Sequence, residues 1–242
     1  PRINQAMATE SYALNFPNNA AVDVVSASNS GVTANGSWSL CAWVNVAGYT
    51  GARQDIHGVN FTPINSAISI SSTGLYVLND PVGLISTTVR APIGRMVPIV
   101  TTWDAVNARG CMYFDGYLIY TRTGTATAFT DGKIITGRFA YSAAQPAWAT
   151  VSRRRVFARA LSAEEVMAWS RNNVEPESTG LRAEYNLLAG SGSTDVDTSG
   201  NGNNGTITGA TWVTDRVYTA RVAAANRVPT SGRIAATNRV QL

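Results

Sequence analysis

The stretch DVDTSGNGNNG, residues 195–205, holds the densest set of potential metal ligands in the sequence. Acidic and amide side chains occupy alternate positions, and Gly200 stands where a sharp turn is needed. This pattern is similar to the start of a calcium-binding EF-hand loop, although the twelfth position is Thr206 rather than glutamate and no flanking helices are expected. Calcium is therefore a candidate cofactor, and the alternative is a metal-free turn that uses left-handed Gly and Asn conformations. The candidate ligands are Asp195, Asp197, Asn201 and Asn203.

The acidic residues and the single histidine do not form a catalytic pattern. Glycoside hydrolysis requires two carboxyl groups that face each other across a sugar cleft. Glu184 stands alone, whereas Glu164 and Glu165 lie in the first turn of a predicted helix, where acidic residues favour the helix dipole. His57 has Asp55 nearby but no serine or cysteine nucleophile motif, and we expect it to be a structural or solvated loop residue. The sequence therefore predicts a protein that is not an enzyme, with no catalytic residues.

Two aromatic residues near predicted loops are candidates for sugar binding. A sugar site needs exposed aromatic rings beside a few well-placed polar groups. Trp148 and Tyr141 meet the first condition by their position in the sequence. The alternative is a role in the core, which we expect for most of the six tryptophans because four of them fall within strand or helix patterns.

The C-terminal segment, residues 215–242, carries all of the formal net charge of +4. It has five arginines, one aspartate and, after Tyr218, no aromatic residue, and it repeats the phrase RVAAANRV as RIAATNRV twelve residues later. Most of the Arg-Val and Arg-Ile pairs recur every six residues, which places them on one side of an extended chain. Such a segment cannot bury enough apolar surface to fold alone, so we predict an arm that binds neighbouring subunits. The residues of this predicted assembly arm are Arg216, Arg221, Arg227, Val228, Arg233, Ile234, Arg239 and Val240.

Nucleic acid and membrane partners are not expected. The arm has no aromatic residues interleaved with its arginines beyond Tyr218, whereas proteins that bind single strands stack bases on such residues. The cluster Arg153–Arg155 lies on a predicted strand, which directs Arg154 to one face and its two neighbours to the other, so we expect a solvated sheet face or a subunit contact. No apolar run is long enough to span a bilayer. The N-terminal PRINQAMATE shows no secretory signal pattern, which predicts synthesis in a host cytoplasm.

Cys41 and Cys111 both lie inside apolar, strand-like runs. Two cysteines in 242 residues are too few for a disulfide framework. We expect buried free thiols, with a bridge between the two strands as the alternative.

Short β-rich runs separated by turn signals dominate residues 11–214 and predict an all-β sandwich. The hairpin GCMYFDGYLIYTRT is the clearest element, because Asp115-Gly116 suits a type I′ turn. The only predicted helix lies in LSAEEVMAWSRNN, where Ser162 and Glu165 form a capping box. The predicted organisation is an N-terminal arm over residues 1–10, a single sandwich over 11–214 and an extended basic arm over 215–242.

Five stretches in a fixed order resemble one known family. They are SWSLCAWVNV, PIVTTWDAVNARGCMYFDGYLI, RRVFARALSAEEV, AEYNLLAGSG and DTSGNGNNGTITGATWV. Together they are similar to concanavalin A-like, laminin-G-type jelly rolls over most of residues 10–214. The resemblance implies two curved antiparallel sheets stacked face to face, and binding or scaffolding more often than catalysis. It also raises the expectation of calcium.

The functional prediction combines this fold with the basic arm. We predict a structural assembly protein, specifically a capsid decoration subunit of a tailed bacteriophage located in the virion. The resemblance implies this role, because laminin-G-like jelly rolls recur in such proteins. Its expected partners are further copies of itself and the major capsid protein. The alternative is a carbohydrate-binding, lectin-like module of a phage tail or a bacterial surface protein, with a glycan as its partner.

Overall fold

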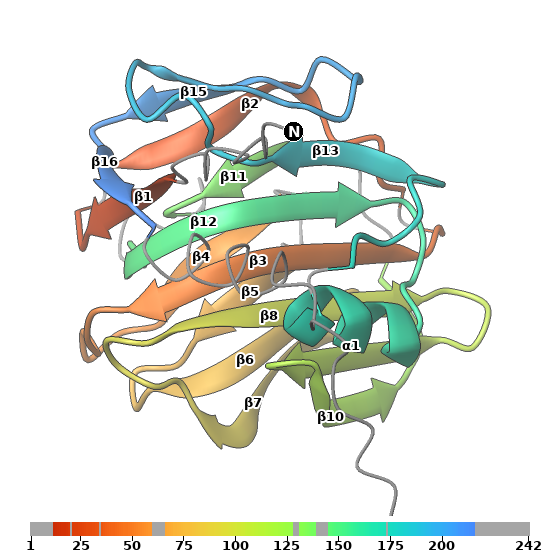
Figure 1. The fold of residues 1–242 in the computed structure, drawn as a ribbon. Helices are drawn as coiled ribbons and strands as arrows, with labels where there is room; N and C mark the ends of the chain where they lie inside the picture. Colours follow the sequence, from red (N-terminus) through yellow and green to blue (C-terminus); the bar gives the residue numbers. More distant parts are fainter. Residues whose placement is uncertain are drawn as a thin grey trace, which may run out of the picture.

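The computed structural model describes residues 12–19, 21–33, 35–59, 66–127, 131–138, 145–172 and 174–215. These residues form two eight-stranded antiparallel sheets and one helix, α1 (Ala163–Asn172). Figure 1 shows the strands of both sheets, with α1 in front of one sheet. The predicted all-β sandwich is confirmed. The predicted N-terminal arm, residues 1–10, lies outside the described residues, as does the predicted C-terminal arm, residues 215–242, except for Asp215.

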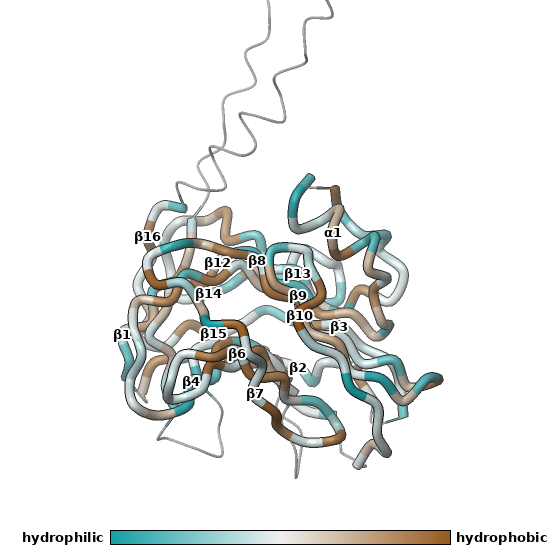
Figure 2. The backbone as a smooth tube through the Cα atoms, turned by 90° about the horizontal axis from the view of Figure 1, so that it is seen from below, coloured by the Kyte–Doolittle hydropathy of each residue, from teal (hydrophilic) through white to brown (hydrophobic). Residues whose placement is uncertain are grey.

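The first sheet has α1 on its outer face (Figure 2). Its strand β13 (Leu181–Tyr185) pairs with the C-terminal half of β12, while β1 pairs with the N-terminal half. The remaining strands lie in the order β10 (Tyr117–Thr123), β9 (Arg109–Phe114), β8 (Met96–Asp104), β3 (Trp38–Val46), β12 (Trp148–Phe157), β1 (Tyr12–Pro17) and β16 (Thr211–Thr214).

The second sheet packs against the inner face of the first. Its strands lie in the order β14 (Thr194–Asp195), β15 (Gly205–Thr208), β2 (Asp23–Asn29), β11 (Lys133–Thr136), β4 (Gln54–Val59), β5 (Ser66–Ile70), β6 (Leu75–Asp80) and β7 (Gly83–Arg90). Four of these strands, β4, β7, β14 and β15, were not predicted from the sequence. Strand β4 also places His57 in a sheet rather than in the expected loop.

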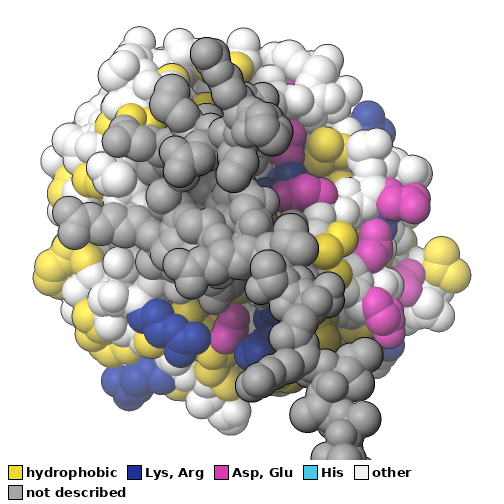
Figure 3. Space-filling view, viewed as in Figure 1, with side chains coloured by type: hydrophobic (Ala, Val, Ile, Leu, Met, Phe, Trp, Pro, Cys, Tyr) yellow, Lys and Arg dark blue, Asp and Glu magenta, His cyan; other side chains and the backbone are white. Residues whose placement is uncertain are grey.

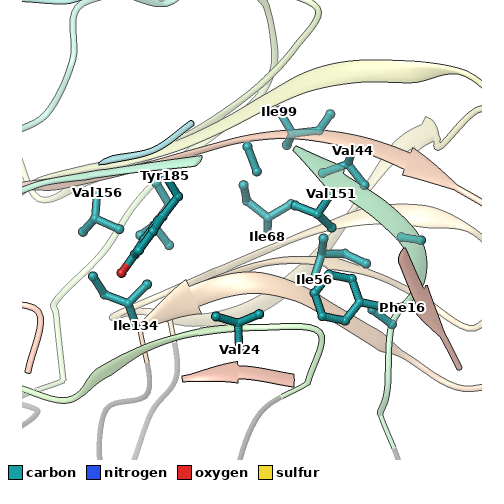
Figure 4. Packing of buried hydrophobic residues seen from close by; sticks show 14 of the residues in the cluster. Phe16, Val24, Val44, Ile56, Ile68, Ile99, Ile134, Val151, Val156 and Tyr185 are labelled. Atoms are coloured by element: carbon teal, nitrogen blue, oxygen red, sulfur yellow. The ribbon is translucent and has the colours of Figure 1, made fainter. Parts of the chain in front are cut away.

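The main core lies between the two sheets. Figure 4 shows Val156 and Tyr185 of the first sheet opposite Val24 and Ile134 of the second. Alternate side chains of each strand point inward, so β-branched residues fill this layer.

A second, smaller cluster lies between the first sheet and α1. Val166 and Trp169, on one face of the helix, pack over Trp43 and Phe157. Because β3 is covered on both faces, it is apolar along nearly its whole length rather than alternating. Four tryptophans are buried in these layers, in agreement with the expectation that most of the six are core residues: Trp38, Trp43, Trp103 and Trp169.

Two local predictions are confirmed in atomic detail. Asp115 and Gly116 have φ values of 50° and 85°, as a type I′ turn requires, and they join β9 to β10. At the start of α1, the Glu165 N–H donates to Ser162 Oγ (3.2 Å) and the Ser162 N–H donates to Glu165 Oε2 (2.9 Å), which completes the capping box.

The cysteines are buried and free, as expected. Burial raises the pKa of the Cys41 thiol to about 12. None of the described helices is both long and apolar enough to cross a membrane.

Candidate functional site

Trp148, the first residue of β12, is the exposed tryptophan of the predicted sugar site. Its side chain is 40% exposed, although its neighbours on the strand are buried. The indole lies close against Gly48, since a Cβ atom on residue 48 would sit 2.5 Å from the ring. Glycine at position 48 therefore allows the ring to approach the loop between β3 and β4.

The backbone of Trp148 is held by a buried glutamine. The Trp148 N–H donates to Gln54 Oε1 (2.7 Å), and Gln54 Nε2 donates to the carbonyl of Gly48 (2.8 Å). The side-chain amide of Gln54 thus links the segment that carries the indole to the segment against which the indole rests. A buried, doubly bonded amide fixes its partners firmly, because breaking either bond would leave a buried polar group unsatisfied.

Polar residues lie on the chain segments that contact the backbone of Trp148. Arg53 donates to Gln145 Oε1 and to Asp55 Oδ2, and Asn18, opposite the end of β12, is exposed. We call Asn18, Arg53, Gln145 and Trp148 the Trp148 rim. Burial raises the pKa of Asp55, while Arg53 and the Ser69 hydroxyl oppose that shift. The rim offers an aromatic face, two amides and a guanidinium to a ligand.

Neither the rest of the rim nor the two residues that support Trp148 were predicted from the sequence. Gln54 and Trp148 are 94 residues apart, and no local pattern marks either Gln54 or Gly48 as a partner of a tryptophan. The predicted sugar-binding Tyr141 lies outside the described residues, as do all eight residues assigned to the assembly arm.

The candidate calcium loop is closed on itself and on β13. Asp197 is nearly buried, and its carboxylate accepts the backbone N–H groups of Glu184 (2.9 Å), Ser199 (2.9 Å) and Asn203 (2.8 Å). The side-chain amides of Asn201 and Asn203 donate to carbonyls of β13. Asp197 is thus the hydrogen-bond acceptor around which this loop is built.

Asp195 takes no part in that arrangement, because it forms an ion pair. It is fully buried at the edge of the second sheet and binds Arg154 of the first sheet. Arg154 also donates to Thr136 Oγ1 (2.9 Å) and lies over the ring of Tyr185 at 4.7 Å. Burial raises the pKa of Asp195, and Arg154 opposes that shift. The pair links the two sheets through the core.

As arranged, the two candidate carboxylates are already engaged, which disfavours a calcium site. Asp197 accepts three N–H groups and Asp195 binds an arginine, while the two asparagines use their Nδ2 groups to donate to carbonyls. Within the described ranges, no group of three or more His, Cys, Asp or Glu residues is placed to hold a metal ion. Calcium binding stays a prediction. From this arrangement we expect the same Tm in calcium and in chelator. A Tm that falls on chelation would show a site made by other donors.

Replacing Asp197 with alanine should lower the free energy of unfolding by about 2–3 kcal/mol, because three backbone N–H groups lose a charged acceptor where little water reaches them. Urea unfolding measures this loss. Asp104→Ala is the matched control, since Asp104 accepts the N–H groups of Val106 and Asn107 at an exposed turn. Equal losses in the two variants would contradict the proposed role of burial.

The arginine cluster divides between the two faces of β12, as predicted, but the expected solvated face is wrong. Arg153 and Arg155 lie on the outer face, where both bind Glu175 and Arg155 also binds Glu184. All three arginines are buried. The sequence pattern could not reveal this burial, because the acidic partners come from β13 and from the segment after α1.

The carboxylates considered for catalysis make structural contacts or are exposed. Glu165 binds Arg159, and these hydrogen bonds lower the pKa of Glu165. Glu184 binds Arg155, and Glu164 is an exposed residue of the first helical turn. In Figure 3 the acidic side chains of the visible face gather mainly on the side of α1.

The single histidine is a core residue. His57 is fully buried, and its Nδ1 lies 3.0 Å from Thr136 Oγ1. Burial lowers its pKa to about 3, and the nearby Arg154 adds to that effect. The expected structural role is therefore right, and the expected loop position is wrong.

Two solved structures share the fold over most of the described strands. A protein from Bacteroides ovatus, titled a "putative carbohydrate binding protein", has a TM-score of 0.67 and 18% identity; the match covers 85% of this chain and 60% of that one. The heptameric SAP-like pentraxin of Limulus polyphemus has a TM-score of 0.54 and 13% identity, with 86% and 93% covered. At these identities the likeness shows the fold alone.

Other comparisons are more limited. A Trypanosoma rangeli sialidase matches with a TM-score of 0.47 and 18% identity, over 56% of this chain and 23% of that one, too little to support any conclusion. A search of curated proteins found no match. The model of one family, described as the concanavalin A-like lectin/glucanases superfamily, matches residues 18–167. That range is more than half of the chain and contains both β3 and the hairpin of β9 and β10. This protein therefore belongs to the concanavalin A-like lectin/glucanases superfamily.

Proposed function

We propose that this protein binds carbohydrate at the Trp148 rim, as a recognition module rather than a catalyst. The observation that carries the proposal is the half-exposed indole of Trp148, which lies against Gly48 on a backbone held by Gln54. A flat, fixed aromatic surface binds the apolar face of a sugar ring with little loss of side-chain entropy on binding.

The polar groups of the rim supply the second requirement of a sugar site. The amides of Asn18 and Gln145 and the guanidinium of Arg53 belong to the segments beside Trp148. Amides both donate and accept hydrogen bonds, so they match hydroxyl groups in either role. The family contains lectins, and one protein with the same fold carries a carbohydrate-binding title, which supports this choice over an assembly role.

The test is binding of the purified full-length chain to a glycan array, followed by titration calorimetry with the best ligand. Trp148→Ala should weaken that binding by at least about tenfold, because stacking contributes on the order of 1–3 kcal/mol. Trp148→Phe should retain part of the affinity.

Tyr117→Ala is the matched control. Tyr117 is also an exposed aromatic residue, at 52%, but it lies on β10 and packs against Arg171. We expect its removal to leave glycan binding unchanged. Absence of any glycan ligand, or equal affinity of wild type and Trp148→Ala, would exclude the proposal.

No finding supports the predicted capsid partner or virion location. Those predictions were drawn from the arm at residues 215–242, all of which except Asp215 lies outside the described residues. The proposed function is therefore glycan recognition.

A further inference from the structure

An apolar groove lies at the edge of the sandwich, away from the Trp148 rim. Its volume is about 330 Å³, and it is lined by Leu187, Leu188, Ala189, Val196 and Trp212 together with two threonines. Leu188 is 60% exposed and Val196 is 50% exposed. Exposed apolar side chains that gather around one groove, rather than lying scattered, mark an interaction surface.

The groove is rigid on one side. The indole N–H of Trp212 donates to the carbonyl of Gly192 (2.8 Å), and its ring packs edge-to-face on Tyr12 at 6.5 Å. Trp212 thus holds the loop after β13 against β16. The groove is a formed feature of the sheet edge and needs no rearrangement to accept apolar side chains.

Strand β16 borders this groove and has an unpaired edge. It pairs with β1 through Tyr12↔Thr214 to Asn15↔Thr211, and among the described strands none pairs with its other side. An edge strand offers a row of backbone donors and acceptors to an added strand. An extended peptide can therefore hydrogen-bond to β16 while alternate side chains enter the groove.

The chain itself contains a segment of suitable chemistry. Residues 216–242 follow β16 almost directly and carry β-branched apolar residues, each preceded by arginine. In a strand, consecutive side chains point to opposite faces. Each Val or Ile can thus enter an apolar groove while its arginine remains in water. These residues are Val217, Val222, Val228, Ile234 and Val240.

We propose that the groove beside β16 receives the C-terminal segment of a second copy of this chain, added as a strand to the edge of β16. Because the segment follows β16 directly in the chain, pairing with its own β16 would require the chain to reverse its direction, whereas pairing with the β16 of a second copy would not. Its 27 residues span up to about 90 Å when extended, which is ample to reach an adjacent subunit. This inference is independent of glycan binding.

Sedimentation velocity of the full-length chain over a range of concentrations tests the association. We expect wild type to form species larger than a monomer. Val196→Asp should shift association to at least about tenfold higher concentration, because a carboxylate would occupy the apolar groove. Ile234→Asp, in the segment itself, should have the same effect. The matched control is Leu84→Asp, an exposed apolar residue on β7 at the far edge of the second sheet.

A wild type that is monomeric throughout would overturn the proposal. So would a Val196→Asp variant that associates as wild type does. Because Val196 is half-exposed, its substitution should leave the fold intact, and circular dichroism checks this.

Cross-linking identifies the occupant. A mixture of Val196→Cys chains and Ile234→Cys chains should form a disulfide-linked heterodimer on mild oxidation, with the link mapped to positions 196 and 234. The buried native thiols should not interfere. Leu84→Cys replaces Val196→Cys in the control mixture and should give no link. If a chain that carries both substitutions forms the link only within itself, a second copy is excluded as the source of the segment. If no link forms in the mixture or in the doubly substituted chain, the groove is excluded as the binding site of the segment.

Discussion

Replacing Arg154 with methionine, with Asp195 left in place, should lower the free energy of unfolding by about 3–5 kcal/mol at pH 7. Both side chains are completely enclosed between the sheets. Removing the guanidinium leaves a buried carboxylate with no opposite charge, and Thr136 loses a donor. Urea unfolding followed by the fluorescence of the six tryptophans measures the change.

The pH dependence of this variant distinguishes a lost ion pair from lost packing. Burial already raises the pKa of Asp195, and Arg154 is the group that opposes the shift. Without Arg154 the pKa should rise further, so that the folded state favours the protonated acid. Stability that depends on a raised carboxyl pKa is present at low pH and lost as pH rises. The deficit of Arg154→Met should therefore shrink as the pH falls below 7.

Two further variants control the interpretation. Arg154→Met combined with Asp195→Leu should recover most of the loss, because a buried ion pair and an apolar pair of similar volume differ little in stability. Arg95→Met breaks an ion pair with Asp115 in which the arginine is largely exposed, and it should change the stability by less than about 1 kcal/mol. A loss for Arg154→Met as small as that for Arg95→Met would contradict the buried pair.

Local sequence signals predicted the elements whose cause is local. The type I′ turn at Asp115-Gly116 and the capping box of Ser162 and Glu165 depend on residues that are neighbours in the chain, and both are present. The period of two along β12 likewise predicted that Arg154 points away from Arg153 and Arg155.

Features that depend on distant partners were missed or misjudged. Arg154 is buried because Asp195 lies 41 residues away on the other sheet, and nothing near either residue in the sequence indicates this. The alternation of Asp197 and Asn203 looked like a set of metal ligands, yet the same short polar side chains serve as acceptors and donors for the backbone. Composition cannot separate these roles, because a carboxylate that binds calcium equally accepts N–H groups.

The Trp148 rim shows the same division. The sequence identified Trp148 as a tryptophan near a loop, but its ring rests against Gly48 and its backbone is held by Gln54, both in a different part of the chain. Strand β4, which carries Gln54, was not predicted because Gln, Asp and His interrupt its apolar pattern. These polar residues are tolerated since each finds a partner inside the sandwich.

His57 should make the protein lose stability as the pH falls from about 6.5 to about 3. Its pKa in the folded state is about 3, against 6.5 for an ordinary histidine, because burial disfavours the charged imidazolium. The unfolded chain therefore takes up a proton in this range while the folded protein does not. Stability from a lowered pKa is complete above the unfolded value and disappears as the pH falls through the folded value. A difference of this size corresponds to about 5 kcal/mol.

Since carboxyl groups also titrate at the lower end of this range, the comparison of wild type with His57→Gln isolates the histidine. A glutamine side chain reaches Thr136 but has no proton to gain, so the slope of stability against pH between 6.5 and 4.5 should be smaller in the variant by about 1.4 kcal/mol per pH unit. The imidazole resonance of the single histidine provides a direct check, because it should not titrate above pH 4 while the protein is folded. A midpoint near 6.5 in the folded protein would show that His57 is accessible to water, and the buried connection from β4 through Thr136 to Arg154 would then be wrong.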